Sequence, residues 1–357
     1  MKQQQMFALY SAYLLASFGA TTATGLRQVL EGEISHDQVS RHLAGKKPTG
    51  ADRWHPVKPF VRQVQAAAGG LSLDDSSEEK PSTEENDLVG WPYDHAKAAL
   101  VNGSNFLTAL YASQGVSLPV GFYLIAQTEK YRDPKTQTER RRSPVSKNEL
   151  GRELSNQAGA KHSPFRFVGF ATWFAAAETL VFIKRAPPRD FVCPVKTTRK
   201  VALSLADKQP GRYLRVETRV LEEHPPREVY LEGVDFPLVL VKQVFTNEDG
   251  SWGILSLVSS ATTRSFADLT TTYQKRWQVE CYPKSLKQNV SLEKSPTQTA
   301  PPQTHHFFAA LCGSIKLERL KGKTKLKHFA LKSKLYLHAL HSAFSTLRAL
   351  TPVQVTA

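Results

Sequence analysis

The chain has 357 residues, with 47 Lys or Arg against 32 Asp or Glu, and its formal net charge is +15. This excess indicates a polyanionic partner, nucleic acid above all. The positive charge is spread along the chain and not gathered on one terminal amphipathic helix, which disfavours an acidic membrane surface as the partner.

The number of cysteines and the lengths of the apolar runs indicate the cellular compartment. Three cysteines in no C-x-x-C spacing argue against a disulfide framework or a zinc cluster, and they favour a reducing compartment. The apolar run 6–18 is shorter than the about 20 residues that cross a bilayer, and no small-residue cleavage site follows it. We therefore expect a soluble cytoplasmic protein without a membrane partner.

Residues 1–66 are predicted to form a helical region. Thr24 is expected to cap one short helix and Ser35 the next, with a tight turn between them. One interpretation is a helix-turn-helix that binds DNA, in which the second helix directs Gln38, Arg41 and His42 outward. The other is a small helical bundle that only packs, and the sequence leaves both open.

Residues 67–189 are predicted to form a mixed α/β core. Residues 71–74, LSLD, are predicted as a short strand that ends at Asp74, with an acidic loop after it. The run SNFLTALYAS, the turn at Gln114-Gly115 and a second run, in which apolar residues alternate from Val116 to Leu124, predict an antiparallel hairpin. A capping box at Ser146–Glu149 then opens a helix, and the strand FRFVGF and a further helix follow.

The remaining sequence divides into three parts. Residues 190–262 are predicted to be mostly β, with NEDG as a hairpin turn. Residues 263–294 are predicted as a helix that starts at a Ser265–Asp268 cap pair. Residues 295–357 begin with a Pro/Thr-rich break over 295–304 and continue as basic helices, whose lysines form either a solvated face or a DNA contact.

One stretch, YQKRWQVECYPKSLKQ over residues 273–288, sets four functional side chains on one stripe. At about 100° per residue, Tyr273, Arg276, Glu280 and Lys287 fall on one side of a helix. Core-facing stripes are apolar, so this one faces either water, as an exposed salt-bridged stripe, or a charged partner. With Asp74, Glu280 also offers the carboxylates that Mg²⁺ prefers for phosphoryl transfer.

The same four residues match a Y-x2-R-x3-E-x6-K signature at every spacing, and through it the chain resembles bacterial insertion-sequence transposases of the DDE class. Flanking segments such as SLEKSPT and HFFAAL are also similar to that family. The resemblance implies a ribonuclease-H-like mixed sheet, with a β-rich insertion before the helix that bears the catalytic Glu. It further implies metal-dependent cleavage and strand transfer on double-stranded DNA, at transposon inverted repeats and target, by a homo-oligomer associated with the nucleoid.

The resemblance also implies a role for each residue. Asp74, with Asp75 as the alternative, and Glu280 would be catalytic metal ligands for two Mg²⁺ or Mn²⁺ ions. Arg276 and Lys287 would hold the DNA backbone, and Tyr273 would position a phosphate or a base.

The sequence departs from that family at the second acid. FRFVGF is followed by Ala171, where the family has Asp before a small residue and Trp-Phe. Asp190 lies beyond the next helix, and Glu178 within that helix is expected to face water, so neither replaces the missing acid. The departure predicts severe loss of activity, and a DNA-binding remnant without catalysis is the alternative function.

Further positions were interpreted structurally. Pro283 lies inside the predicted catalytic helix, where it removes a backbone hydrogen bond and favours a kink. His305 and His306 resemble a metal pair, but adjacent residues splay apart on a helix, and core packing or capping is the preferred interpretation. Trp173 is predicted to be a core residue, with contact to a DNA base as the alternative.

Overall fold

The computed structural model describes residues 3–66, 68–94, 97–134, 136–160, 164–185, 188–218 and 225–350. The chain divides into two compact units, residues 1–52 with 282–357 and residues 53–281. This division groups the N-terminal helices with the C-terminal ones, which the sequence-based partition kept apart. Within the described ranges, no helix combines the length and the apolarity that crossing a bilayer requires.

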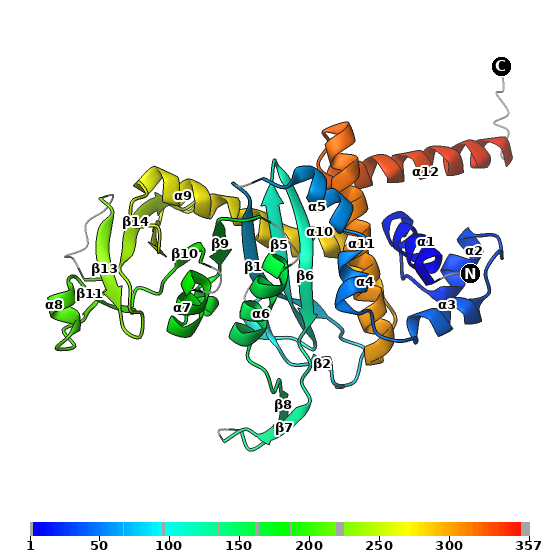
Figure 1. Ribbon diagram of the computed structural model, residues 1–357. Coiled ribbons are helices and arrows are strands. Elements are labelled where there is room, and N and C mark those ends of the chain that lie inside the picture. The colour runs from blue at the N-terminus through cyan, green and yellow to red at the C-terminus, as the bar shows by residue number, and fades with distance from the viewer. Residues whose placement is uncertain are drawn as a thin grey trace. The chain divides into compact units, whose positions relative to one another are not determined.

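The first unit is helical (Figure 1). Its elements are α1 (Gln3–Ala16), α2 (Ala23–Val29), α3 (His36–Leu43), the second half of α10 (Trp277–Asn289), η2 (Leu292–Lys294), α11 (Ala300–Thr324) and α12 (His328–Leu350). Helix α1 packs along α11, where the Tyr10 hydroxyl lies 3.0 Å from His306 Nδ1. His305 and His306 are both fully buried, so their predicted packing role in the core is confirmed.

The two N-terminal helices form as predicted, with two corrections. Ser35 makes a capping box with Gln38 at the start of α3, as expected. The cap of α2 is Thr22 and not Thr24, because the Thr22 hydroxyl accepts the Gly25 amide at 2.9 Å. His42 does not point outward, since its ring packs edge-on against the Phe7 ring, with 4.4 Å between the ring centroids.

The second unit is built on an eleven-stranded mixed sheet. Its strand order is β12-β11-β13-β14-β15-β10-β9-β1-β5-β2, and β6 pairs with β5. The bounds are β1 (Gly70–Glu79), β2 (Val89–Gly90), β5 (Gly103–Ser113), β6 (Val116–Leu124), β9 (Phe167–Phe170), β10 (Asp190–Pro194), β11 (Lys200–Ala202), β12 (Leu214–Arg215), β13 (Arg227–Leu231), β14 (Leu238–Thr246) and β15 (Trp252–Ser259). The predicted mixed α/β class is therefore correct.

Short elements complete this unit. Two small hairpins pair β3 (Tyr93–Asp94) with β4 (Ala99–Leu100) and β7 (Glu129–Arg132) with β8 (Glu139–Arg142). The helices are α4 (Gly50–Trp54, at the boundary), α5 (Lys58–Val64), α6 (Lys147–Ala160), η1 (Thr172–Phe174), α7 (Ala177–Arg185), α8 (Leu205–Lys208), α9 (Phe266–Lys275) and the first half of α10. α6 packs against β5 and β6, and α7 against β10.

The first half of the sheet is an antiparallel meander followed by parallel strands. β1 pairs antiparallel with β5, and β5 pairs antiparallel with β6 through a turn at Gln114 and Gly115, as predicted. Both turn residues have positive φ, 51° and 75°, which suits a tight two-residue hairpin turn. β1 then pairs parallel with β9, and β9 parallel with β10.

The predicted end of the first strand at Asp74 is wrong. β1 runs on to Glu79, because β5 provides hydrogen-bonding partners as far as the Glu79–Gly103 pair. Glu78 is buried in this extension and pairs with Lys80 at 2.8 Å. Asp74 therefore lies in the middle of a strand and not at its terminus.

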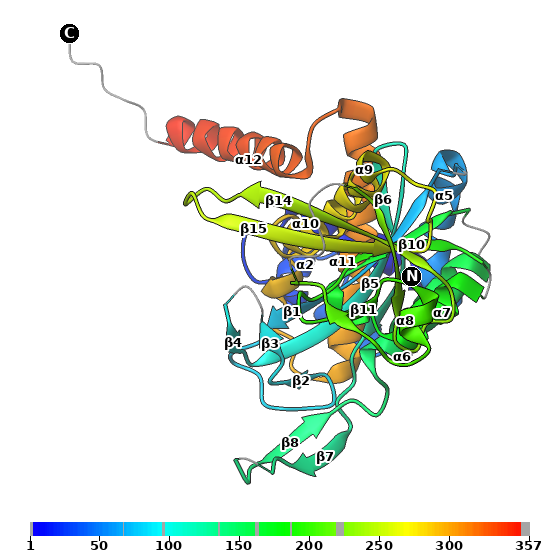
Figure 2. The ribbon, with the colours of Figure 1, turned by 90° about the vertical axis from the view of Figure 1, so that its left-hand side faces the viewer.

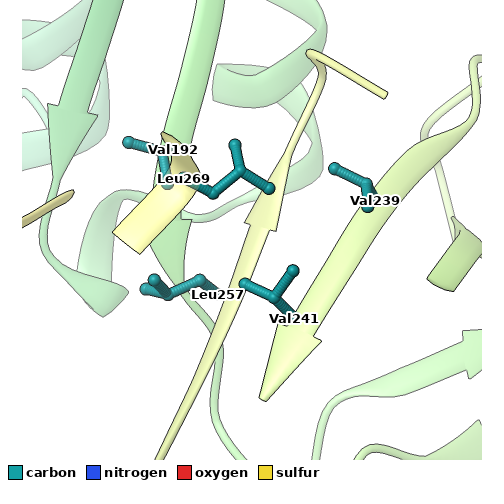
Figure 3. Close-up of a cluster of buried hydrophobic side chains, with 5 residues drawn as sticks. All are labelled: Val192, Val239, Val241, Leu257 and Leu269. Atoms are coloured by element: carbon teal, nitrogen blue, oxygen red, sulfur yellow. The ribbon is translucent and has the colours of Figure 1, made fainter. Parts of the chain in front are cut away.

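The second half of the sheet is the predicted β-rich segment. β14 and β15 form one long ribbon (Figure 2), joined by the predicted NEDG turn. Helix α9 covers this ribbon through Leu269, which packs in a buried cluster with Val192, Val239, Val241 and Leu257 (Figure 3). Within this segment the stretch GRYLRVETRVL, residues 211–221, was expected to be β; only Leu214–Arg215 forms a strand there among the described residues, and residues 219–224 lie outside them.

The helix predicted over 263–294 is divided into two. α9 starts at the expected Ser265–Asp268 capping box and ends at Lys275, and α10 starts at Trp277. Arg276 lies at the junction, where its amide donates to the Tyr273 carbonyl and its carbonyl accepts from Val279, both at 2.8 Å. These i→i+3 bonds tighten the chain at Arg276, while α10 remains helical through Pro283.

The Pro/Thr-rich break is shorter than predicted. α11 already begins at Ala300, and Pro301 and Pro302 lie in its first turn. Proline is tolerated there because the first amides of a helix have no intrahelical acceptor.

Candidate functional site: an acid–arginine cluster

Arg276 joins side chains from three parts of the second unit. Its guanidinium donates to the Glu280 carboxylate through Nη2, and Nη2 also lies 3.0 Å from the Tyr273 hydroxyl. Its Nη1 lies 3.7 Å from Asp74 Oδ2. We call Asp74, Tyr273, Arg276 and Glu280 the acid–arginine cluster. Four of the five predicted site residues thus come together.

The secondary structure explains how these side chains meet. The tight turn at Arg276 directs its side chain toward the sheet, and its methylene carbons lie 3.5–3.7 Å from the position a Cβ would take at Gly169 on β9. Glu280, one turn further along α10, lies on the same side as Arg276. Asp74, on the strand next to β9, completes the cluster. Arg276 thus faces the sheet, and the interpretation as a solvent-exposed salt-bridged stripe is wrong for this residue.

Burial sets the electrostatics of the cluster. The side chain of Arg276 is only 6% exposed, that of Asp74 17% and that of Glu280 32%. Burial raises the pKa of Asp74 to about 6, and the charge of Arg276 acts against that rise. The Nε and Nη1 atoms of Arg276 are buried without a hydrogen-bond partner, and the charge of the guanidinium is balanced by the Asp74 and Glu280 carboxylates.

Asp75 points to the opposite face of β1. Its carboxylate pairs with Lys147 at the start of α6, and Asn105 Nδ2 lies 3.5 Å from it. Of the two acids that the sequence left open, Asp74 is the one on the same side of β1 as Arg276 and Glu280.

Ala171 directly follows the last registered pair of β1 and β9 and is the N-cap residue of η1. That last pair is Leu73 and Phe170, so the same register continued by one residue would bring Asp74 and Ala171 side by side. Paired residues on neighbouring strands are about 5 Å apart and point to the same face. A carboxylate at position 171 would therefore adjoin Asp74.

The two acids considered as replacements lie elsewhere. Asp190 is registered with Phe167, at the opposite end of β9 from Ala171, and it pairs with Lys184 at 2.8 Å. The side chain of Glu178 is 85% exposed on α7, as predicted. Neither carboxylate completes the cluster.

Lys287 is not a member of the cluster. It lies two turns beyond Glu280 on α10, and its Nζ pairs with Glu293 Oε1 at 2.9 Å. The resemblance implies that Lys287, like Arg276, contacts the DNA backbone, and that role stays a prediction.

The donor set does not fit a pair of divalent ions. Asp74 and Glu280 supply two carboxylates, and the guanidinium of Arg276 interacts with both. Position 171, where the resemblance implies a further carboxylate, is an alanine. In the described part of the chain, no three His, Cys, Asp or Glu side chains come together as a group that could hold a metal ion. Two-metal sites need carboxylates shared between the ions, which this arrangement lacks.

Sequence reasoning missed two neighbours of the cluster. Thr108 is paired with Asp74 across β1 and β5, and its Oγ1 is buried without a hydrogen-bond partner. Gly169 leaves the space over which Arg276 lies. The hairpin prediction could have placed Thr108 on a strand, but the register with β1 depends on packing that local sequence does not encode.

Comparison of the chain with protein-family models and with curated proteins found no match.

Proposed function

We propose that the chain is a DDE-class DNA transposase in which one catalytic carboxylate has been lost. It would bind the inverted repeats of a mobile element and retain the architecture for cleavage without the full ligand set. The alternative, a DNA-binding remnant, shares every feature except that a carboxylate at position 171 would not restore cutting.

The observation that supports this proposal most strongly is where the strand order places the two acids. The order β6-β5-β1-β9-β10 has three antiparallel strands followed by two parallel to the first, which agrees with the ribonuclease-H-like arrangement that the resemblance implies. The β-rich segment from β11 to β15 stands between this core and the helix with Glu280, as the family pattern requires. Asp74 and Glu280, distant in sequence, then meet at Arg276.

Charge and chemistry agree with a DNA partner. The net charge of +15 favours a polyanion. As parts of the same proposal, the protein acts as a homo-oligomer on DNA in a nucleoid-associated cytoplasmic location. Mg²⁺ or Mn²⁺ would be its cofactor only where the ligand set is complete.

A cleavage assay tests the proposal. The native chain and Ala171→Asp are incubated with duplex DNA that carries the inverted repeat, with Mg²⁺ or Mn²⁺, and nicked product is measured alongside a gel shift. We expect both proteins to bind and only Ala171→Asp to cut, with a rise of at least about a hundredfold, because a lost metal ligand costs that much or more.

Two controls make the result specific. Ala171→Asn is matched in size but lacks the charge and should stay inactive, and Ala171→Asp combined with Glu280→Gln should lose the gained activity. Equal cutting by the native chain would show that position 171 is not a ligand position. Binding by both proteins without cutting by either would favour the remnant, and absence of binding would reject both functions.

A further inference from the structure

A second potential site lies beyond the acid–arginine cluster, in a cavity of about 680 Å³ in the second unit. It is bordered by η1, the start of α7, the segment after β10 and the turn at Gly233. The cavity volume lies within the range of about 300–1,000 Å³ typical of small-ligand sites.

Trp173 presents an aromatic surface to this cavity. In η1 the neighbouring Phe174 is fully buried and anchors the turn, which leaves Trp173 58% exposed. Asn148 Nδ2 lies 3.4 Å from the Trp173 carbonyl and ties the turn to α6. The prediction that Trp173 is a core residue is therefore wrong. The small side chains of Ala176 and Ala177 also line the cavity.

Positive charge surrounds the ring. The Lys196 ammonium lies 5.0 Å from the centroid of the Trp173 ring. Arg199 and Lys200 also line the cavity, against a single acid, Glu232. Lys196 and Arg199 are held in one tight turn by a 2.9 Å bond from the Arg199 amide to the Lys196 carbonyl.

An aromatic ring that adjoins several cations is suited to a nucleotide. Bases stack on exposed indole rings whatever their sequence, and Arg or Lys side chains bind the phosphates on either side. A paired base in a duplex keeps its faces against its neighbours, so only an unstacked base can occupy such a place.

We propose that this cavity binds an unpaired nucleotide of a DNA strand, with the base on Trp173 and its phosphates near Arg199 and Lys200. That the strand is DNA rests on the proposed function. Trp173 follows Ala171 by two residues in the chain. Trp173 is then a binding residue for single-stranded DNA.

Fluorescence anisotropy with a labelled single-stranded oligonucleotide, and with the duplex of the same sequence, tests this assignment. For Trp173→Ala we expect roughly tenfold weaker binding of the single strand, because one stacking contact is lost. Duplex binding should change less than about twofold, since phosphate contacts dominate it. Trp173→Phe keeps an aromatic face and should retain most of the affinity.

Two more variants sharpen the test. Lys200→Gln should lower the magnitude of the salt slope for the single strand by about 0.7, the value for one phosphate contact. Trp91→Ala removes a tryptophan of similar exposure, 54%, that does not line this cavity, and should leave binding unchanged. Thermal unfolding confirms that each variant is folded.

The assignment fails if Trp173→Ala leaves single-strand binding intact, or weakens single-strand and duplex binding equally. Neither single-strand binding nor duplex binding requires cleavage, so an inactive Ala171→Asp protein would not affect this test. If the native chain binds duplex DNA and Trp173→Ala changes nothing, only the nucleotide site in the cavity is rejected. If the native chain binds no DNA at all, the proposed function is rejected.

Discussion

The guanidinium of Arg276 interacts with two carboxylates that are far apart in sequence, and its charge opposes the rise that burial gives to the pKa of Asp74. Burial raises the pKa of Asp74, and Arg276 is the main influence that lowers it. A carboxyl group whose pKa is raised in the folded state binds protons more tightly there. The stability that Asp74 contributes is therefore present below its unfolded value of about 4 and is lost as the pH rises through about 6.

Removal of the positive charge should move that pKa further up. We expect Arg276→Ala to raise the pKa of Asp74 by about one unit or more, because an opposite charge at this distance lowers a carboxyl pKa by about one to three units. Carbon-13 NMR of the aspartate carboxyl groups measures this directly. Tyr273→Phe keeps the guanidinium and is the matched control, and an unchanged or lower pKa in Arg276→Ala would contradict the account.

Single residues also show what sequence could predict at the site. The spacing of Arg276 and Glu280 predicted their pairing, which follows from helix geometry alone. Their burial against Gly169 was not predictable from spacing, because it depends on a long-range contact with β9. Thr108 was missed for the same reason.

At the scale of elements, turns and helix caps were predicted correctly where they depend only on residues close together in the sequence. The hairpin turn at Gln114 and the capping boxes at Ser35 and Ser265 follow from residues within a few positions of each other. β1 exceeded its predicted length because its hydrogen bonds come from β5, a distant segment. The break between α9 and α10 falls at Arg276, where the side chain pairs with Asp74, and not at Pro283.

α10 includes Pro283 within a continuous helix, and this has a cost. The proline ring has no amide hydrogen for the i−4 carbonyl and crowds the preceding turn. We expect Pro283→Ala to raise the free energy of unfolding by about 1–3 kcal/mol, measured by urea denaturation. Lys284→Ala, at the next and exposed position, should change it by less than about 0.5 kcal/mol. A destabilised Pro283→Ala would mean that the proline is required for packing.

At the scale of the whole molecule, the order of predicted strands and helices indicated an α/β protein, and the large mixed sheet agrees with that fold class. Neither that order nor the composition could predict that the register of β1 and β9 would bring Ala171 toward Asp74. That neighbourhood depends on the parallel register of β1 and β9, which are separated in the chain by a hairpin and α6. Only the resemblance to DDE transposases pointed to position 171 beforehand.

Mn²⁺ binding, followed by electron paramagnetic resonance, tests most directly the claim that Asp74, Glu280 and position 171 form one site with a missing ligand. We expect the native chain to bind Mn²⁺ weakly, and Ala171→Asp to bind it at least about tenfold more tightly. Glu280→Gln in the Ala171→Asp background should abolish that gain. The account would be contradicted if the native chain bound Mn²⁺ as tightly as Ala171→Asp and lost the ion on Glu280→Gln.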